Sequence, residues 1–325
     1  MFRNRTTLMC LSILGVICYH LCLRGIHIGR LNVGYAGTDV FMLLSGYGIA
    51  KSLAHNSIKQ FYIHRLRRIL PLWIVMISSV CIINLILGVG NLGLDIFLLN
   101  ITSLSFYYNP DLLPEWYLST LLLFYAVSPL LKMLLEKGSW GLVILISLVV
   151  VLEEEFLGTG RWQYDNAVAR FPLYLLGMQC ALSNKEDLPY KVTIPLFLLS
   201  VAFFFQGHHY LFSACAVLLA IQIANILIDK WGVLKNKLFN WIGTHTLDIY
   251  VGNTIAAVIA ELIFSPEKRN PHIRFLGVFS SVLPDFRSKP LKVFSSGAIC
   301  HRSAAFCVTT YPINAYTFVA GIFQT

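Results

Sequence analysis

The sequence predicts an all-α protein, a polytopic transmembrane bundle of about nine to ten helical spans. Mean hydropathy is +0.68 and only 13% of the 325 residues are charged, about half of the share in ordinary soluble domains. Many apolar runs approach the roughly 20 residues that a helix needs to cross a bilayer. These runs are continuous, whereas the strands of a membrane barrel alternate apolar and polar residues in segments of about ten.

The apolar runs place nine spans in one membrane domain, residues 1–264. The spans are expected at 8–24, 33–53, 69–90, 115–131, 140–156, 168–184, 192–206, 209–228 and 239–264. Residues 92–108 are apolar but short, and we interpret them as an interfacial or re-entrant segment on the outer side. Residues 265–325 form an atypical tail, polar and basic at first; its last part, 303–323, is either a weak tenth span or a poorly ordered end.

The distribution of lysine and arginine predicts the orientation of these spans. If the N-terminus is cytoplasmic, the outer loops up to residue 264 hold only Arg24, Arg30 and Arg161, and the inner loops hold most of the other basic residues. This bias follows the positive-inside rule. The net charge of +9 therefore reflects loops, and no motif that reads a nucleic-acid groove accompanies it. Nucleic acid is not an expected partner.

Two ionisable residues fall inside the first two spans, where such residues are costly and indicate function. His20 lies about 6 Å from the outer end of its span and Asp39 about 9 Å, at 1.5 Å per residue. In a tight hairpin they would be nearly level. A carboxylate beside an imidazole fixes its tautomer and raises its basicity, as in a general base. The alternative is a structural hydrogen bond between two helices, and the pair alone leaves both interpretations open.

Three arginines, Arg65, Arg67 and Arg68, directly precede the third apolar run. On a helix, Arg65 and Arg68 share a face and Arg67 lies off to one side. Planar guanidinium groups suit a phosphate-rich ligand. Lysine would serve equally for topological charge or for contact with anionic lipid, so the choice of arginine favours a specific phosphate ligand.

Other candidates have structural alternatives. Glu115 and Trp116 begin the fourth span at the outer level, where a helix N-terminal charge and an interfacial aromatic residue are the simpler interpretations. Gly46 and Gly48 allow helices to approach closely.

The eight cysteines show no CxxC or Cys/His spacing typical of zinc, so no metal site is expected.

Four stretches, in this order, resemble the acyltransferase-3 family of bacterial membrane acyltransferases, which modify surface polysaccharides and related glycans. They are Ile17-Cys18-Tyr19-His20; Gly37 to Tyr47 (GTDVFMLLSGY); His64 to Pro71 (HRLRRILP); and Trp116-Tyr117-Leu118-Ser119 followed by Phe124, Tyr125 and Pro129. Weaker similarities are Arg170-Phe171-Pro172 with Gly177, and Gly243 to Tyr250. The resemblance covers about residues 8–264.

The resemblance implies transfer of an acyl group, usually acetyl, from cytoplasmic acyl-CoA to a hydroxyl of a cell-surface or lipid-linked glycan. His20 would be the base or a transient acyl carrier, with Asp39 beside it. Arg65 and Arg68, with Arg67, would hold the CoA phosphates. The pantetheine arm would then thread between helices toward His20.

The remaining expectations also follow from the resemblance. Substrate-binding residues would be Glu115, Trp116, Arg170 and Asn253. Acetyl-CoA or another acyl-CoA is the expected co-substrate, without a metal, and the partners are membrane lipid and the glycan acceptor. The expected location is the bacterial cytoplasmic (inner) membrane.

Three departures from the family pattern keep two alternatives open. Leu8-Met9-Cys10 stands where members often have an arginine, Leu121 and Leu122 where many have glutamates, and Val251-Gly252-Asn253 where a histidine is common. Beside the acyltransferase, one alternative is a non-catalytic paralogue, which these departures favour, and the other is a transporter of glycans or lipid-linked sugars. A transporter is expected to show repeated halves or paired broken helices, and the sequence shows neither.

Overall fold

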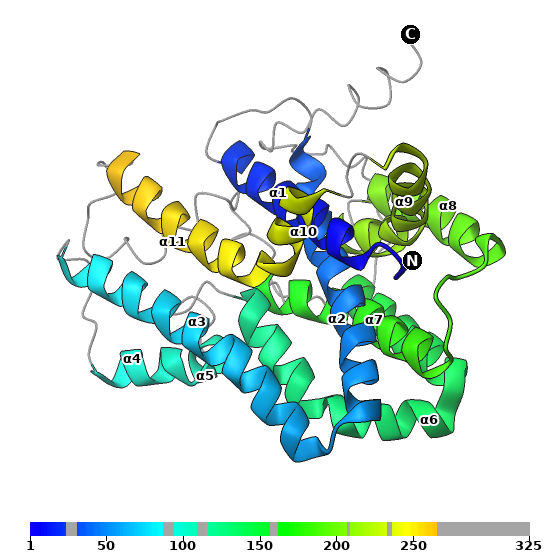
Figure 1. Ribbon diagram of the computed structural model, residues 1–325, viewed down its shortest axis with the longest axis horizontal. Helices are drawn as coiled ribbons and strands as arrows, with labels where there is room; N and C mark the ends of the chain where they lie inside the picture. Colours follow the sequence, from blue (N-terminus) through cyan, green and yellow to red (C-terminus); the bar gives the residue numbers. More distant parts are fainter. Residues whose placement is uncertain are drawn as a thin grey trace, which may run out of the picture.

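The computed structural model describes residues 1–23, 31–86, 94–108, 116–156, 162–206, 209–232 and 236–264. Every regular element in these ranges is a helix (Figure 1), which confirms the all-α prediction. The elements are α1 (Arg5–Leu23), the 3-10 helix η1 (Leu31–Ala36), α2 (Gly37–His55), α3 (Ile58–Ile86), α4 (Leu94–Ile101), α5 (Leu104–Tyr108), α6 (Trp116–Phe156), α7 (Trp162–Leu182), α8 (Tyr190–Gln206), α9 (His209–Trp231), α10 (Lys237–Thr244) and α11 (Thr246–Phe264). The tail after residue 264 lies outside the described residues.

Several helices have the length and composition of membrane spans. Among the described residues, four are long and apolar enough to cross a bilayer: Arg5–Cys22, Ile58–Ile83, Trp116–Lys137 and Leu211–Trp231. Shorter apolar helices are Trp140–Glu153, Tyr190–Phe205 and Thr246–Ala260. The total of nine to ten spans stays a prediction.

Two boundaries differ from those expected. The fourth and fifth predicted spans form one continuous helix, α6, because the intervening segment is rich in good helix formers and Lys132 pairs with Glu136 at 3.2 Å. The last predicted span is instead divided at His245 into α10 and α11. There the Thr244 hydroxyl donates to the carbonyls of Asn240 and Trp241, local bonding that competes with helix continuation.

The segment expected not to cross the membrane contains α4 and α5. Their eight and five residues span only about 12 and 8 Å, well short of a bilayer. The indole Nε1 of Trp73 donates to the carbonyl of Ile101 at 2.7 Å, and the Tyr107 hydroxyl donates to that of Ser119 at 3.0 Å. These bonds hold α4 against α3 and α5 against the start of α6.

The centre of the bundle is the contact between α2 and α7, where two glycines bring the backbones together. A Cβ atom on Gly46 would lie 2.0 Å from the carbonyl oxygen of Tyr174, and one on Gly177 would lie 2.1 Å from that of Leu43. Only glycine fits at either position. The close approach predicted for Gly46 is therefore confirmed.

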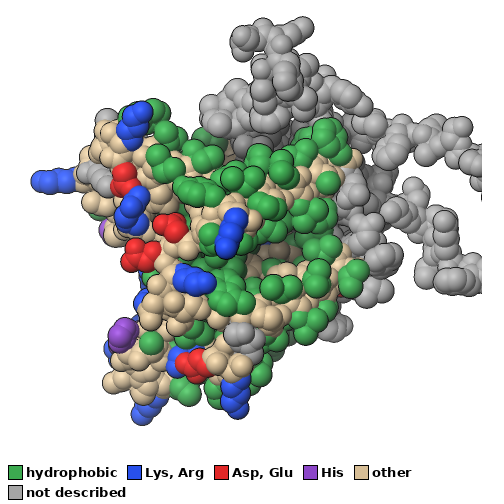
Figure 2. Space-filling model, turned by 90° about the vertical axis from the view of Figure 1, so that its right-hand side faces the viewer, with side chains coloured by type: hydrophobic (Ala, Val, Ile, Leu, Met, Phe, Trp, Pro, Cys, Tyr) green, Lys and Arg blue, Asp and Glu red, His purple; other side chains and the backbone are tan. Residues whose placement is uncertain are grey.

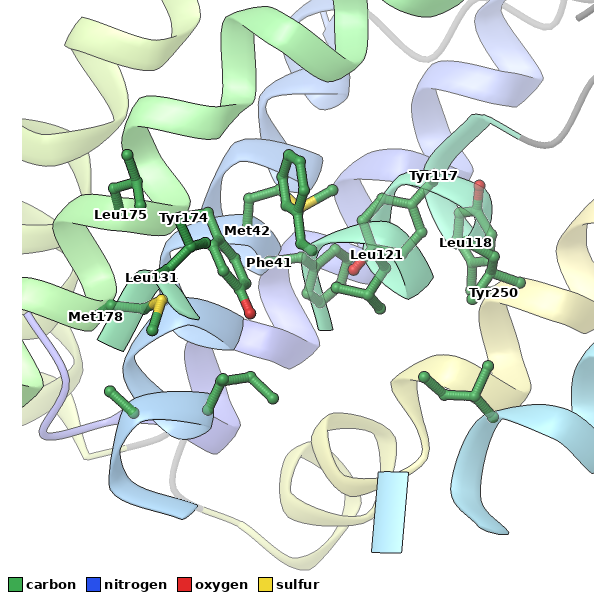
Figure 3. Close-up of a cluster of buried hydrophobic side chains, with 14 of the residues drawn as sticks. Phe41, Met42, Tyr117, Leu118, Leu121, Leu131, Tyr174, Leu175, Met178 and Tyr250 are labelled. Carbon is green, nitrogen blue, oxygen red and sulfur yellow. The ribbon is translucent and has the colours of Figure 1, made fainter. Parts of the chain in front are cut away.

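Around this contact a continuous apolar core joins four helices. Figure 3 shows Phe41 of α2 between Tyr174 of α7 on one side and Tyr117 of α6 and Tyr250 of α11 on the other. These four side chains are at most 6% exposed. The core thereby fixes α6, α7 and α11 relative to α2.

The other helices pack at the edges of the core. α3 lies beside α11, α8 pairs with α9, and α1 packs against α2, α10 and α11 (Figure 1). Charged side chains gather at one side of the face in Figure 2, and hydrophobic side chains spread over its middle. Large exposed apolar residues on α3, α6 and α8, such as Leu85, Leu148 and Leu198, suit contact with lipid tails.

Candidate functional site

A pocket opens where α1 and α3 begin, and we call it the arginine pocket. Its walls come from α1, α2, α3, α6 and α11, and the cavity volume is about 50 Å³. The cations among its lining residues are Arg5, Arg65 and Arg68, and no lining residue is acidic. The rest of the wall is mainly apolar and aromatic. The pocket therefore concentrates positive charge beside an apolar interior.

The guanidinium groups of the arginine pocket lack carboxylate partners within it. The Nε atoms of Arg5 and Arg65 are buried and make no hydrogen bond. The Arg65 guanidinium instead lies 5.8 Å from the ring centroids of both Phe61 and Tyr125. Aromatic faces attract a cation without neutralising it. The donors of the pocket thus remain available to an anion.

The placement of the three arginines of α3 agrees with helical geometry. Arg65 and Arg68 line the pocket and Arg67 does not, as expected for residues three apart on a helix with an off-face neighbour. Of the residues predicted to bind phosphates, the structure brings together Arg65 and Arg68. Arg67 is exposed on α3 outside the pocket lining.

Sequence reasoning missed Arg5. It belonged to the basic start of the first span, and the family pattern directed attention to residues 8–10. Arg5 and Met9 share a face of α1 and both line the pocket. The sequence feature connected with Arg5 was Gly48 on α2, which had been noted only for close helix approach. Gly48 lies against the Arg5 side chain: a Cβ atom on Gly48 would stand 2.8 Å from Nη2 of Arg5.

His20 is bonded to Asn253. The side-chain amide nitrogen of Asn253 lies 2.6 Å from Nδ1 of His20, which joins the far end of α1 to α11. Both residues were singled out from the sequence, although not as partners. The bond orients the imidazole, and its direction depends on the tautomer of the ring.

Asp39 is paired with Arg170, and not with His20 as the hairpin argument suggested. Its Oδ1 lies 3.0 Å from Nε of Arg170, and both side chains are at most 2% exposed. The Nε–H donates to the Thr38 hydroxyl at 3.1 Å, and Nη1 donates to the side-chain oxygen of Asn166 at 2.7 Å. The glycine-mediated contact of α2 with α7 explains the difference, because it brings Arg170 up to Asp39.

Trp116 joins this buried ion pair to the rest of the site. The guanidinium of Arg170 lies 4.9 Å from the Trp116 ring centroid, so two of the predicted substrate-binding residues are in contact. Arg170 itself is buried, with only 1% of its surface exposed. The next residue, Tyr117, stands 5.1 Å from Tyr250 between ring centroids. Tyr250 precedes Asn253 by one helical turn. The start of α6 therefore connects the Asp39–Arg170 pair to the His20–Asn253 pair.

The arginine pocket does not reach His20 in this structure. Its lining includes Tyr117 and Tyr250, and the residues of α1 between Met9 and His20 that pack in the same core, Ile13 and Val16, are at most 2% exposed. These buried side chains lie in the core beside the path that the resemblance implied for the donor arm. Glu115, the remaining predicted site residue, lies outside the described residues.

The chain is similar to a known protein family and to a few named bacterial proteins. A family model described as an acyltransferase domain matches residues 8–284, past the boundary at 264 that the motifs indicated. Three Staphylococcus aureus proteins named provisionally as O-acetyltransferases, from strains COL, MSSA476 and MRSA252, are each 34% identical over 92 residues, 26% of this chain. The match spans only 14% of each relative. No solved structure matches.

Proposed function

The chain belongs to the acyltransferase-3 family, and we propose that it transfers an acetyl group from acetyl-CoA to a hydroxyl of a cell-surface or lipid-linked glycan. The observation that carries this proposal is the arginine pocket, three guanidinium groups without a carboxylate at the end of α1 opposite His20. The names of the Staphylococcus relatives favour acetyl as the acyl group and oxygen as the acceptor atom.

The donor matches the charge of the arginine pocket. Coenzyme A carries a diphosphate and a further phosphate, and guanidinium groups bind phosphate oxygens through paired, charge-assisted hydrogen bonds. Arg65 and Arg68 would hold these groups at the mouth. The apolar wall behind them, which includes Met9 and Leu121, suits the uncharged part of the arm.

His20 would act on the acceptor. With the Asn253 amide turned so that its oxygen accepts from Nδ1–H, Nε2 would carry the lone pair that accepts the proton of a sugar hydroxyl. The hydroxyl oxygen then attacks the thioester carbonyl, the carbon–sulfur bond breaks, and the imidazolium returns the proton to the leaving thiolate. A positioned base contributes about 10²–10⁴-fold to such a step. In the variant mechanism, Nε2 carries the acetyl group transiently.

Asp39 and Arg170 would act as positioning residues. Both are buried, so they support the start of α6 from within the bundle. The cation of Arg170 faces the Trp116 ring, and Tyr117 follows directly. This places the pair behind the aromatic residues that separate the arginine pocket from His20.

Tyr117 and Tyr250 line the pocket and are at most 6% exposed, so the reaction would require these buried rings to move when the donor arm passes toward His20. In the proposed orientation the N-terminus and the arginine pocket face the cytoplasm of a bacterium, where acyl-CoA is made, and His20 lies near the outer surface of the inner membrane.

The decisive experiment uses the purified protein in lipid nanodiscs with acetyl-CoA and a glycan acceptor. We expect release of free CoA with acetylation of the glycan, and loss of both in His20→Ala, with the folded protein retained on size-exclusion chromatography. A matched control is His55→Ala at the end of α2. Full acetylation by His20→Ala would show that the proposed chemistry is wrong.

A deletion strain separates this function from glycan transport. Loss of acetyl groups with normal glycan export supports the enzyme. Accumulation of unmodified glycan inside the cell supports a transporter instead. If neither acetylation nor location changes, the chain is a non-catalytic paralogue.

A further inference from the structure

We infer that Arg5 is a phosphate-binding residue of the donor site, held in place by the absence of a side chain at Gly48. The inference rests on the proposed function and adds a residue that lies in none of the four stretches resembling the family. It explains how a chain with Leu8-Met9-Cys10 where relatives often have an arginine still presents a cation from its first helix. The cation comes from one turn earlier.

The first support is the unneutralised charge of Arg5. Its side chain lines the arginine pocket with Arg65 and Arg68, and its buried Nε makes no hydrogen bond. Like charges gathered in a partly buried pocket repel one another, and a buried donor without an acceptor is costly. An anion in the pocket would relieve both costs.

The contrast with Arg3 strengthens this point. Arg3, two residues earlier, forms an ion pair with Asp229 and its side chain is 59% exposed. Both arginines belong to the basic start that topology alone would explain. Only Arg5 is directed into a pocket without a counter-charge, so topology does not account for its placement.

The second support is the fit of the guanidinium against α2. A Cβ atom on Gly48 would stand 2.8 Å from Nη2 and 3.1 Å from Nη1 of Arg5. A side chain at position 48 would require the flexible end of Arg5 to shift from the place where it lies. Gly48 follows Ser45, which lines the pocket, by one turn, so this face of α2 forms part of the same wall.

The ligand chemistry follows from the number and type of donors. Three guanidinium groups line the pocket, and no acidic residue lines it. They suit a ligand with several phosphate groups better than a ligand with one carboxylate. The proposal commits to the phosphates of the nucleotide part of the donor. A phosphorylated lipid headgroup offers similar oxygens, and the experiment distinguishes the two sources.

The test compares Arg5→Gln and Arg5→Lys with the control Arg3→Gln, in nanodiscs of zwitterionic lipid. We expect Arg5→Gln to weaken acetyl-CoA binding about 10- to 100-fold, the range for loss of a hydrogen bond to a charged group. Arg5→Lys should fall between Arg5→Gln and wild type, because it keeps the charge and loses the fork. Arg3→Gln should bind like wild type.

A phosphate-free donor separates ligand binding from a merely structural role. The KM for acetyl-pantetheine, which lacks the nucleotide and its phosphates, should be the same in Arg5→Gln and wild type. ADP should compete with acetyl-CoA in wild type and compete about 10-fold less well in Arg5→Gln. Equal loss for both donors would show a structural effect and overturn the inference.

Gly48→Ala tests the same geometry while keeping every charge. It should weaken acetyl-CoA binding in the same direction as Arg5→Gln. The matched control is Gly141→Ala on α6, where an added Cβ would meet nothing within 4 Å. Wild-type affinity in Gly48→Ala would contradict the proposed role of the glycine.

The outcomes also separate this inference from the proposed function. If Arg65→Gln loses acetyl-CoA and Arg5→Gln does not, Arg5 is not a phosphate ligand and the proposed function stands. If ADP binds through Arg5 but no acetyl group is transferred, the inference stands and the proposed function fails. If Arg5 matters only when anionic lipid is added, the ligand is a headgroup and the inference is overturned.

Discussion

Nδ1 of His20 lies 2.6 Å from the side-chain nitrogen of Asn253, although 233 positions separate the two residues in the chain. The bond ties the first helix of the chain to the last described one. Since the imidazole has only two nitrogens, an amide on Nδ1 decides what Nε2 offers to a substrate. Asn253 thus orients the ring, and in the proposed mechanism its amide oxygen would keep the proton on Nδ1.

We therefore expect Asn253→Ala to lower kcat about 10- to 100-fold, part of the range of a positioned base, with little change in the KM for acetyl-CoA. Steady-state kinetics with a glycan acceptor measure both quantities. Asn240→Ala, at an exposed position of α10, is the control and should keep wild-type kinetics. A raised KM with unchanged kcat would place Asn253 in donor binding instead.

The Asp39–Arg170 pair should matter first for stability. Asp39→Ala leaves the Arg170 cation buried without its carboxylate, and breaking a buried pair in this way costs about 3–5 kcal/mol. Thermal unfolding in detergent should show a clearly lowered Tm. Lys132→Ala breaks the more exposed pair with Glu136 and should lower stability by only about 0.2–0.5 kcal/mol. Equal effects of the two changes would contradict the structural role of Asp39.

Tyr250 is expected to limit the length of the acyl group. In the proposed function the acyl group would lead the donor arm past Tyr250 and Tyr117, which line the pocket. Tyr250→Ala removes one ring, and we expect the ratio of kcat/KM for butyryl-CoA over acetyl-CoA to rise about 10-fold or more. Tyr250→Phe keeps the ring and should leave the ratio unchanged. An unchanged ratio in Tyr250→Ala would show that the acyl group stops elsewhere.

The backbone contact of α2 with α7 should not tolerate a methyl group. In Gly46→Ala the new Cβ would stand 2.0 Å from the Tyr174 carbonyl oxygen, so the helices must move apart, and overpacking typically costs about 1–3 kcal/mol or more. Gly141→Ala has free space and gains up to about 1 kcal/mol in helix propensity. Opposite changes in Tm are expected, and a stable Gly46→Ala variant would contradict the close packing.

The sequence predicted the helical class and most helix positions, because long apolar runs and the distribution of basic residues are local properties. It also predicted that Arg65 and Arg68 share a face, since that follows from the helical repeat alone. The break at His245 and the continuity of α6 depend on particular hydrogen bonds and on helix propensity near Lys132, which a hydropathy pattern does not contain.

Partnerships within the site were harder to predict. His20 and Asp39 were expected to meet because their depths matched, but depth says nothing about which side of each helix faces which neighbour. The glycine contact between α2 and α7 brings Arg170 next to Asp39. Asn253 was predicted to bind substrate, and its bond to His20 depends on how α11 packs against α1.

One helix carries both Arg5 and His20. They are fifteen positions apart on α1, about 22 Å at 1.5 Å per residue. If Arg5 binds the donor phosphates and His20 acts at the acyl group, α1 sets this distance between the two ends of the donor. Acetyl phosphate, in which the two groups share one oxygen atom, cannot occupy both ends at once, however abundant it is in the cell.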